Sequence, residues 1–256
     1  MIKLPAEARR FGLQIREFFR KQSQCCRPTR VDRNSHVYTS GQRDGMIYFI
    51  DSGLVKLLLP SPEGKECLLG VRAPGDIFGE LCLSGQISRL ETAVAMQDVG
   101  LKQMSYRSFL MSLKQESLLE GLIQYLAVRI AEQQEVIAGL ATENSEQRLA
   151  RTLLYLGQRH GRVDARGTCI GLRLSHEELS AMVGTTRPRI GIFLKKFREL
   201  GLIRLNEDRC LVIEEAKLED YLLQDPSDKQ SGEEASRKLE SRSPTSLPLS
   251  PDSPSL

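Results

Sequence analysis

The stretch that most constrains the fold is residues 174–197, LSHEELSAMVGTTRPRIGIFLKKF, which predicts two short helices joined by a tight turn. Ser175 and Glu178 have the S-x-x-E spacing of a capping box, which marks the start of a helix. Gly184 follows where the chain must turn, because glycine adopts the left-handed conformation at little cost. Thr185 or Thr186 can then cap a second helix.

The second helix combines an apolar face with an unneutralised basic surface. Pro188 lies in its first turn, where a missing amide hydrogen costs little. The apolar spacing of Ile190, Leu194 and Phe197 predicts its buried face. Between Leu179 and Arg198 there are five basic residues and no acidic one. This pattern is typical of a helix-turn-helix, and the alternative is a helical hairpin with solvated arginines.

Composition limits the kind of partner and the compartment. A formal net charge of +3 is too small to indicate nucleic acid by itself, so the positive charge would have to be local. No apolar run approaches the roughly 20 residues that span a bilayer, so we expect no membrane segment. The N-terminus contains acidic residues and no continuous apolar core, so it does not predict a signal peptide. We therefore expect a cytoplasmic protein.

The six cysteines are scattered along the chain, and only Cys25 and Cys26 are adjacent. No C-x-x-C pair and no Cys/His cluster has the spacing of a metal site, so we expect no metal. In the cytoplasm we expect the cysteines to be reduced and partly buried. The alternative is a redox sensor at the adjacent pair.

The N-terminal half predicts a helix followed by an antiparallel roll. Residues 1–28 form an expected helical lead-in, with Phe11, Ile15, Phe18 and Phe19 on one face. Residues 29–114 contain strand-length segments with frequent glycines, which favour a jelly-roll that could enclose a small ligand. Within this region PSPEGKE predicts a hairpin loop, and 105–114 a short helix.

Within the roll, residues 74–95 contain a candidate anion site. Glu80 and Arg89 are separated by a segment short enough to form one helical turn, whose amides could face an anion. An arginine fork holds phosphate with charge-assisted hydrogen bonds, whereas a carboxylate accepts hydrogen bonds from ribose hydroxyls. The alternative is that Glu80 and Arg89 pair with each other.

Residues 115–142 predict one long helix with a heptad seam. We interpret the seam as a parallel dimerisation surface; the alternative is that it packs on its own roll. Gln133 is its one polar position and could fix register or face a ligand. The apolar positions of the seam are Leu119, Ile123, Leu126, Ile130, Ile137 and Leu140.

Residues 143–223 predict a winged helix-turn-helix domain, and residues 224–256 a tail. A first amphipathic helix over 143–159 is followed by an expected loop, GRVDARGTCIG. LIRL and CLVI flank NEDR, which predicts a two-stranded wing, and 214–223 forms a last helix or strand. The tail is rich in serine and proline and has no aromatic residue, so we expect it to be disordered.

Taken in order, these segments resemble the CRP/FNR family of bacterial transcription regulators over about residues 20–223. The resemblance rests on MIYFIDSGLVKL, the PGDIFGE…GQISR cassette, the heptad helix and VGTTRPRIGIFLKKFRELGLI. It implies an α+β fold: a cyclic-nucleotide-binding-like jelly-roll, a long dimerisation helix and a winged helix-turn-helix. It also implies a homodimer that binds palindromic double-stranded DNA, contacts RNA polymerase and receives an effector signal at the roll.

The resemblance assigns candidate effector residues. Gly79 and Glu80, followed by Leu81, match the glycine-glutamate of the nucleotide cassette, and Arg89 matches its phosphate-binding arginine. Leu90 stands where cyclic-AMP-responsive members place a serine or threonine, and the spacing from Glu80 to Arg89 is one residue shorter. The adenine-facing positions fall at Gln133 and Gln134, which are not the expected hydroxyl residues. The implied effector is therefore a cyclic nucleotide or another small molecule, and no cofactor is assigned.

In the second helix of the motif, Arg187 matches a base-contacting arginine of the family, but Pro188 and Ile192 replace a glutamate and an arginine that read bases. We expect Arg187 to contact guanine, and Arg189, Lys195 and Lys196 to contact phosphates. The full set of expected DNA-binding residues is Ser175, Thr185, Thr186, Arg187, Arg189, Lys195 and Lys196.

Other functions are not supported by the sequence. The cysteine pattern lacks the spacing of the family's iron-sulfur sensors, and a lone His36 is a weak basis for haem. The three histidines lie in unrelated elements, and we find no catalytic Ser/His/Asp or Cys/His arrangement, so we assign no catalytic residue. A cyclic-nucleotide module without DNA function stays as an alternative, although the basic second helix argues against it.

Overall fold

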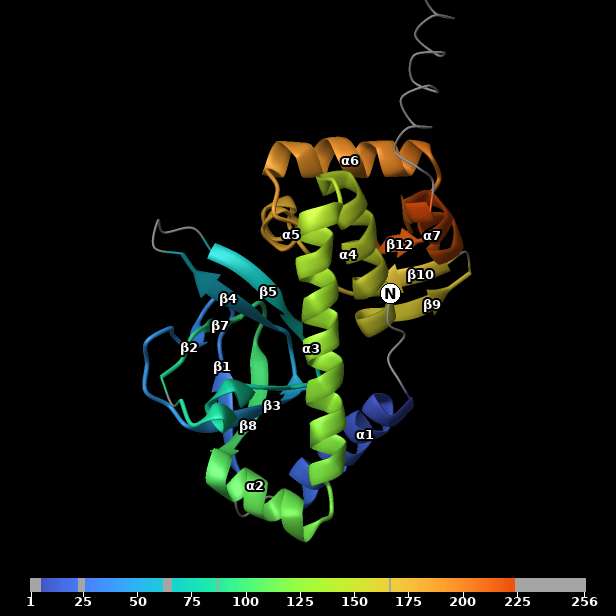
Figure 1. The fold of residues 1–256 in the computed structure, drawn as a ribbon. Helices are drawn as coiled ribbons and strands as arrows, with labels where there is room; N and C mark the ends of the chain where they lie inside the picture. The colour runs from blue at the N-terminus through green and yellow to red at the C-terminus, as the bar shows by residue number, and fades with distance from the viewer. Residues whose placement is uncertain (1–5, 23–25, 62–65, 87, 166, 224–256) are drawn as a thin grey trace, which may run out of the picture.

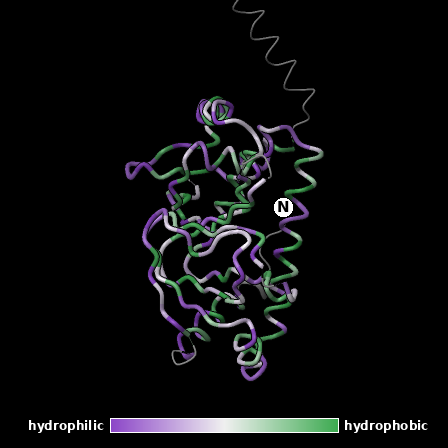
Figure 2. The backbone as a smooth tube through the Cα atoms, turned by 90° about the vertical axis from the view of Figure 1, so that its left-hand side faces the viewer, coloured by the Kyte–Doolittle hydropathy of each residue, from purple (hydrophilic) through white to green (hydrophobic). Residues whose placement is uncertain are grey.

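In a computed structural model, residues 6–22, 26–61, 66–86, 88–165 and 167–223 are described. The chain forms a lower β-roll and an upper helical domain, with one long helix beside both (Figure 1). The hydrophobic segments lie inside each of the two bodies (Figure 2). The expected tail, 224–256, and most of the PSPEGKE loop lie outside the described residues.

The roll consists of two four-stranded antiparallel sheets, in the orders β1-β8-β3-β6 and β2-β7-β4-β5. Tyr38, Ile50 and Phe78 fill the space between them. Glycine and turn residues between short strands give this architecture, as the sequence predicts. The strands are β1 (Arg27–Val31), β2 (His36–Tyr38), β3 (Met46–Ser52), β4 (Val55–Pro60), β5 (Glu66–Arg72), β6 (Ile77–Phe78), β7 (Thr92–Ala95) and β8 (Val99–Ser105).

The lead-in is a helix, α1 (Ala6–Lys21), that covers one end of the roll. Its four predicted aromatic and aliphatic residues are buried against the roll and α3, and Phe19 stacks on Phe49 of β3. β1 begins at Arg27, slightly before the predicted boundary. A short 3-10 helix, η1 (Glu80–Ser84), is the helical turn expected between Glu80 and Arg89.

Two helices follow the roll. α2 (Tyr106–Gln115) is capped by Ser105, whose side chain accepts a hydrogen bond from the Ser108 amide. α3 (Leu119–Thr142) starts four residues later than the predicted Gln115. The prediction failed because Ser117 has a left-handed φ of 56°, which breaks the helix between α2 and α3. α3 runs beside the roll and the upper domain (Figure 1).

The upper domain contains the predicted helix-turn-helix and wing. Asn144 caps its first helix in a capping box with Gln147. The expected loop GRVDARGTCIG is wrong: it forms a hairpin, and β10 pairs with β12 to give a sheet in the order β11-β12-β10-β9. The elements are α4 (Ser145–His160), β9 (Gly161–Asp164), β10 (Gly167–Ile170), α5 (His176–Val183), α6 (Arg187–Glu199), β11 (Ile203–Leu205), β12 (Leu211–Ile213) and α7 (Glu215–Leu223).

The expectation that all cysteines are reduced is wrong for one pair. Cys169 of β10 and Cys210 beside β12 form a disulfide, with Cα atoms 6.0 Å apart. The 41 residues between them conceal the pair in the sequence, and only the pairing of β10 with β12 brings them together. Cys26 is buried. Cys25 lies outside the described residues, so the alternative of a redox sensor at the adjacent pair is not tested by the structure.

The upper domain rests directly on the roll. Leu58, Leu68 and Val94 of the roll pack against Ala181 and Met182 of α5. Ion pairs reinforce this contact at two places. Lys56 of β4 pairs with Glu178 at 3.2 Å, and Arg159 of α4 lies 3.6 Å from Asp76 and 3.2 Å from Glu132.

Candidate nucleic-acid interface and roll cluster

The helix-turn-helix is built as its sequence predicts. Ser175 Oγ accepts a hydrogen bond from the Glu178 amide at 3.2 Å, and the Ser175 amide donates to the Glu178 carboxylate at 2.9 Å. This closed capping box fixes the start of α5 and engages Ser175 within its own chain. Gly184 ends α5 with a φ of 67°, a conformation that favours glycine. The turn then directs the chain into α6.

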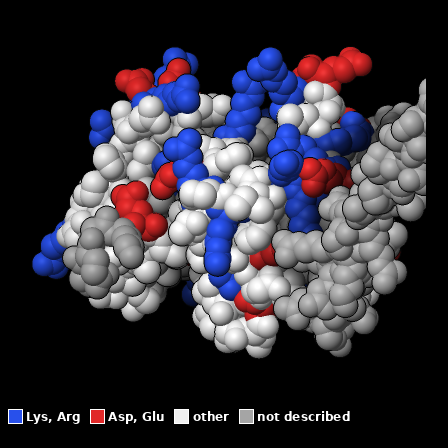
Figure 3. Space-filling model, turned by 90° about the horizontal axis from the view of Figure 1, so that it is seen from above, with Lys and Arg blue, Asp and Glu red and all other residues white. Residues whose placement is uncertain are grey.

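α6 lies across the top of the molecule (Figure 1). Its apolar residues, Ile190, Leu194 and Phe197, are buried in the domain core. Arg187 and Arg189 are exposed at its N-terminal end. Thr186 is the N-cap residue, but its side chain makes no capping hydrogen bond; Thr185 lies in the turn, where its amide donates to Ser180 O. Among the charged side chains that are visible from above, Lys and Arg predominate over Asp and Glu (Figure 3).

The remaining lysines of α6 differ in their freedom to reach a ligand. Lys195 is mostly exposed and lies 3.8 Å from Glu199, one helical turn away. Lys196 lies 3.1 Å from Glu146 of α4, so it helps to hold α6 on its own domain. Ile192, at the position of a family base-reading arginine, is 65% exposed. An exposed isoleucine on a basic helix is suited to apolar contact with a thymine methyl group.

In the roll, Arg89 is buried and held by its own chain. Its Nη1 donates to Gly79 O at 2.8 Å and its Nη2 to Met46 O at 2.6 Å. Its guanidinium carbon lies 4.2 Å from the centre of the Tyr38 ring. Gly79 has a φ of 82°, and a Cβ there would lie 2.8 Å from Arg89 Nη1, so only glycine allows this approach.

Asp44 completes the environment of Arg89, and sequence reasoning missed it. Its carboxylate lies 3.1 Å from Arg89 Nη2, and both side chains are nearly inaccessible to solvent. The Tyr48 hydroxyl donates to Asp44 Oδ2 at 2.7 Å, and the Met46 amide donates to Oδ1 at 2.8 Å. No local motif marks this aspartate, because its partner is 45 residues away in the chain (89 minus 44).

Glu80 does not pair with Arg89, which contradicts the alternative considered from the sequence. It pairs instead with Arg129 of α3 at 3.3 Å. Arg129 in turn donates to the Tyr125 hydroxyl at 3.1 Å. A buried arginine between apolar positions of the long helix was the signal that could have revealed this link between roll and helix.

A further buried acid, Glu91, lies beside this cluster. The Tyr38 hydroxyl donates to Glu91 Oε1 at 2.8 Å. Burial raises the pKa of the Glu91 carboxyl, although the hydrogen bond from Tyr38 opposes the shift. Burial also raises the pKa of the Tyr38 hydroxyl, and the charge of Glu91 adds to that shift. Tyr38 therefore acts as a hydrogen-bond donor at neutral pH.

The other predicted effector residues do not join the buried cluster. Leu81 and Leu90 are 44% and 50% exposed. Gln133 and Gln134 are exposed on α3. The structure thus brings together Gly79 and Arg89, links Glu80 to α3, and leaves the other predicted positions at the surface.

The heptad seam of α3 is largely exposed. Ile123, Ile130, Ile137 and Leu140 are all more than half exposed, whereas Leu119 and Leu126 are partly buried beside α1 and α2. The helix packs on its own roll through a different stripe, Leu122, Tyr125 and Arg129. The alternative in which the seam packs on the roll therefore does not explain its outer isoleucines.

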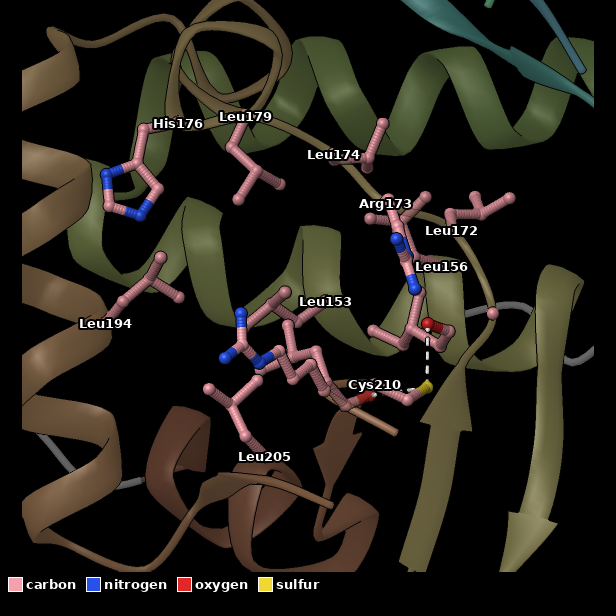
Figure 4. A pocket seen from close by; sticks show the side chains of 14 residues that line it. Leu153, Leu156, Leu172, Arg173, Leu174, His176, Leu179, Leu194, Leu205 and Cys210 are labelled. Carbon is pink, nitrogen blue, oxygen red and sulfur yellow. Dashed lines mark hydrogen bonds between the residues drawn. The ribbon is translucent and has the colours of Figure 1, made fainter. Parts of the chain in front are cut away.

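A cavity of about 270 Å³ lies within the upper domain rather than in the roll (Figure 4). Leucines of α4, α5, α6 and the wing line it, among them Leu153, Leu179 and Leu194. Arg173 and His176 stand at its edge. None of the predicted effector residues lines it.

Family models match both bodies of the chain. A cyclic nucleotide-binding domain matches residues 28–116, and a Crp-like helix-turn-helix domain matches residues 147–221. The transcriptional regulator SdrP of Thermus thermophilus is 32% identical over 164 residues, which cover 64% of this chain and 77% of that protein. The chain belongs to the CRP/FNR family. It is a DNA-binding transcriptional regulator, and its relatives are regulators rather than enzymes.

Other members of the family show the range of signals that such proteins answer. The CRP-like cAMP-activated global transcriptional regulator of Mycobacterium tuberculosis is 29% identical over 194 residues, 75% of this chain and 86% of that one. The c-di-GMP-responsive global regulator CLP of Xanthomonas campestris has a TM-score of 0.62 at 25% identity, over 77% and 98% of the chains. A CooA mutant from Carboxydothermus hydrogenoformans shares the fold, with a TM-score of 0.67 at 23% identity, over 78% of this chain and 88% of that one.

Within the described residues, no helix has the length and apolar character needed to cross a membrane.

Proposed function

We propose that this regulator acts as a homodimer that places its two α6 helices in successive major grooves of a palindromic operator. The observation that carries the proposal is the exposed N-terminal end of α6, where Arg187 and Arg189 face solvent on a predominantly basic surface (Figure 3). A helix-turn-helix dimer reads two half-sites about 34 Å apart, which requires a fixed spacing between the α6 helices.

The seam of α3 supports the dimer. Its exposed isoleucines form an apolar stripe at heptad spacing, and such a stripe buries itself against a second copy in a coiled coil. α3 also contacts the roll through Arg129 and the upper domain through Glu132. A shift in the dimer seam would therefore move the roll and the upper domain together. A signal from a small effector at the roll would then change the spacing of the α6 helices.

The family resemblance extends the proposal to RNA polymerase, which the DNA-bound dimer would contact to change transcription. Single-round transcription on an operator-bearing template, with and without the regulator, measures this step.

The first test separates specific from non-specific DNA binding. The operator is selected from random duplexes with the purified chain, and affinities for operator and random DNA are then measured by fluorescence anisotropy over a range of salt. Arg187→Ala should weaken operator binding by roughly 5- to 100-fold and random DNA much less, because a bidentate guanine contact is worth about 1–3 kcal/mol.

Lys195→Ala is the matched control on the same helix. Lys195 is exposed, so its loss should weaken operator and random DNA alike and reduce the salt slope by about 1. Equal losses on the two DNAs for Arg187→Ala would contradict its assignment to base reading.

A further inference from the structure

The interior of the roll carries a cluster of buried charged groups. Arg89 pairs with Asp44 and Arg129 pairs with Glu80. Buried Arg72 and Glu91 lie close enough to interact electrostatically. Buried charges are retained in proteins when they pair with one another, so this cluster is stable without an added ion. An additional phosphate would bring excess negative charge into a space shielded from water.

Arg89, the residue matched to the family's phosphate-binding arginine, has partners on both terminal nitrogens. Gly79 O accepts from Nη1 and Met46 O from Nη2, the Asp44 carboxylate forms an ion pair with Nη2, and Tyr38 lies against the guanidinium. An arginine binds a phosphate through paired, charge-assisted hydrogen bonds. A phosphate that engaged Nη2 would therefore compete with the Asp44 carboxylate for the guanidinium charge.

Asp44 is firmly placed in this position. Each of its oxygens accepts a hydrogen bond from a second group, Oδ1 from the Met46 amide and Oδ2 from the Tyr48 hydroxyl. Moving this carboxylate would break three interactions at once, two hydrogen bonds and the ion pair with Arg89. Its carboxylate thus presents to Arg89 the charge and oxygens that an effector phosphate would present.

The cluster leaves three polar atoms unsatisfied. Among the described residues, Arg72 Nε, Arg89 Nε and Glu80 Oε2 are buried without a hydrogen-bond partner. Each is a single donor or acceptor site, which a water or a hydroxyl satisfies without adding charge. A cyclic phosphodiester has no proton to offer the Glu80 carboxylate.

We propose that Asp44 is a specificity-determining residue of the roll, whose carboxylate replaces an effector phosphate on Arg89 and excludes cyclic nucleotides. Operator binding then does not depend on cyclic AMP or cyclic GMP. The independence of operator binding from cyclic nucleotides rests on the proposed function. The role of Asp44 concerns the roll alone and is measured without DNA.

The experiment titrates the full-length chain with cyclic AMP and cyclic GMP by calorimetry, up to millimolar concentration. The wild-type chain should show no binding. Asp44→Asn keeps the size of the side chain but removes its charge, so Arg89 becomes available and nucleotide affinity should rise by roughly tenfold or more. Tyr48→Phe is the matched control: it removes one hydrogen bond to Asp44 while the charge stays, and it should bind no nucleotide.

A double variant tests whether the gained nucleotide affinity depends on Arg89. Arg89→Gln added to Asp44→Asn should abolish nucleotide binding, because the gained affinity depends on the arginine. Each variant is checked for cooperative thermal unfolding, and Asp44→Ala replaces Asp44→Asn if the latter does not fold.

Micromolar binding of either nucleotide to the wild-type chain would overturn the proposal. So would the failure of every folded Asp44 variant to gain binding, since another feature would then exclude the anion. If neither nucleotide changes the operator affinity of the wild-type chain, the statement that operator binding is independent of cyclic nucleotides is supported. A rise in operator affinity on adding either nucleotide refutes that statement. A chain that binds no DNA would refute the proposed function and leave the calorimetric result standing.

Discussion

His160, the last residue of α4, is held neutral where the upper domain meets the roll. Burial lowers its pKa from 6.5 to about 4, with Arg159 and Arg72 contributing to the shift and Asp76 opposing it. Its Nε2 is buried without a hydrogen-bond partner among the described residues. The folded state therefore takes up a proton at His160 only at a lower pH than the unfolded chain does.

This residue predicts a pH dependence of stability. Between pH 6.5 and about 4 the unfolded chain binds one more proton at His160 than the folded chain. The free energy of unfolding should therefore fall as the pH drops through this window, by about 1.4 kcal/mol per pH unit and about 3 kcal/mol in all. Urea denaturation at pH 7 and pH 5 measures the loss. His160→Gln should reduce it, and an identical loss in the variant would show that other groups cause it.

At the scale of the element, α3 presents two faces with different tasks. Its inner stripe, Leu122, Tyr125 and Arg129, is buried against α1 and the roll. Its outer stripe, with Ile130 and Ile137, is exposed along the helix. The two stripes lie one residue apart in the sequence, so the same amphipathic segment can pack on its own domain and on a second copy.

The outer stripe predicts how the proposed dimer can be broken. The double variant Ile130→Lys, Ile137→Lys would bury unpaired charges in the seam, so the dimer dissociation constant should rise by roughly 100-fold or more. Light scattering after size exclusion measures the mass across concentrations. Val163→Lys, at an exposed apolar residue of β9 outside the seam, is the control and should leave the mass unchanged. A double variant that stays dimeric would place the dimer interface elsewhere.

At the scale of the whole molecule, Arg159 joins three parts of the chain. From α4 of the upper domain it pairs with Asp76 of the roll and Glu132 of α3, and its side chain is 7% exposed. A buried arginine that balances two carboxylates is costly to remove, because the acids are then left facing each other without a counter-charge.

Arg159→Met should therefore destabilise the protein by about 3–5 kcal/mol and separate its unfolding into two transitions. Calorimetric unfolding measures both effects. Arg204→Met removes an arginine that pairs with Asp164 inside the upper domain alone, and it should keep one transition. A single transition in Arg159→Met would mean that the apolar contact of α5 with the roll couples the bodies without this arginine.

Sequence reasoning recovered the elements that are specified by neighbouring residues. The capping box at Ser175, the turn at Gly184 and the apolar face of α6 depend on spacings of a few residues, and each is present in the structure. It failed at the Cys169–Cys210 disulfide, whose partners lie 41 residues apart in the chain. It also missed two local features that no motif marks, the hairpin of β9 and β10 and the helix break at Ser117.

The same distinction between local patterns and long-range contacts applies to the function. The order of roll, long helix and basic helix-turn-helix by itself determined the family and the DNA-binding end, because those patterns are local and periodic. Only the tertiary structure decided what faces Arg89. Asp44 meets Arg89, Glu80 meets Arg129 and Glu91 meets Tyr38 only in the folded roll. Charges and polar groups buried in a low dielectric must find partners there, whatever their distance in sequence.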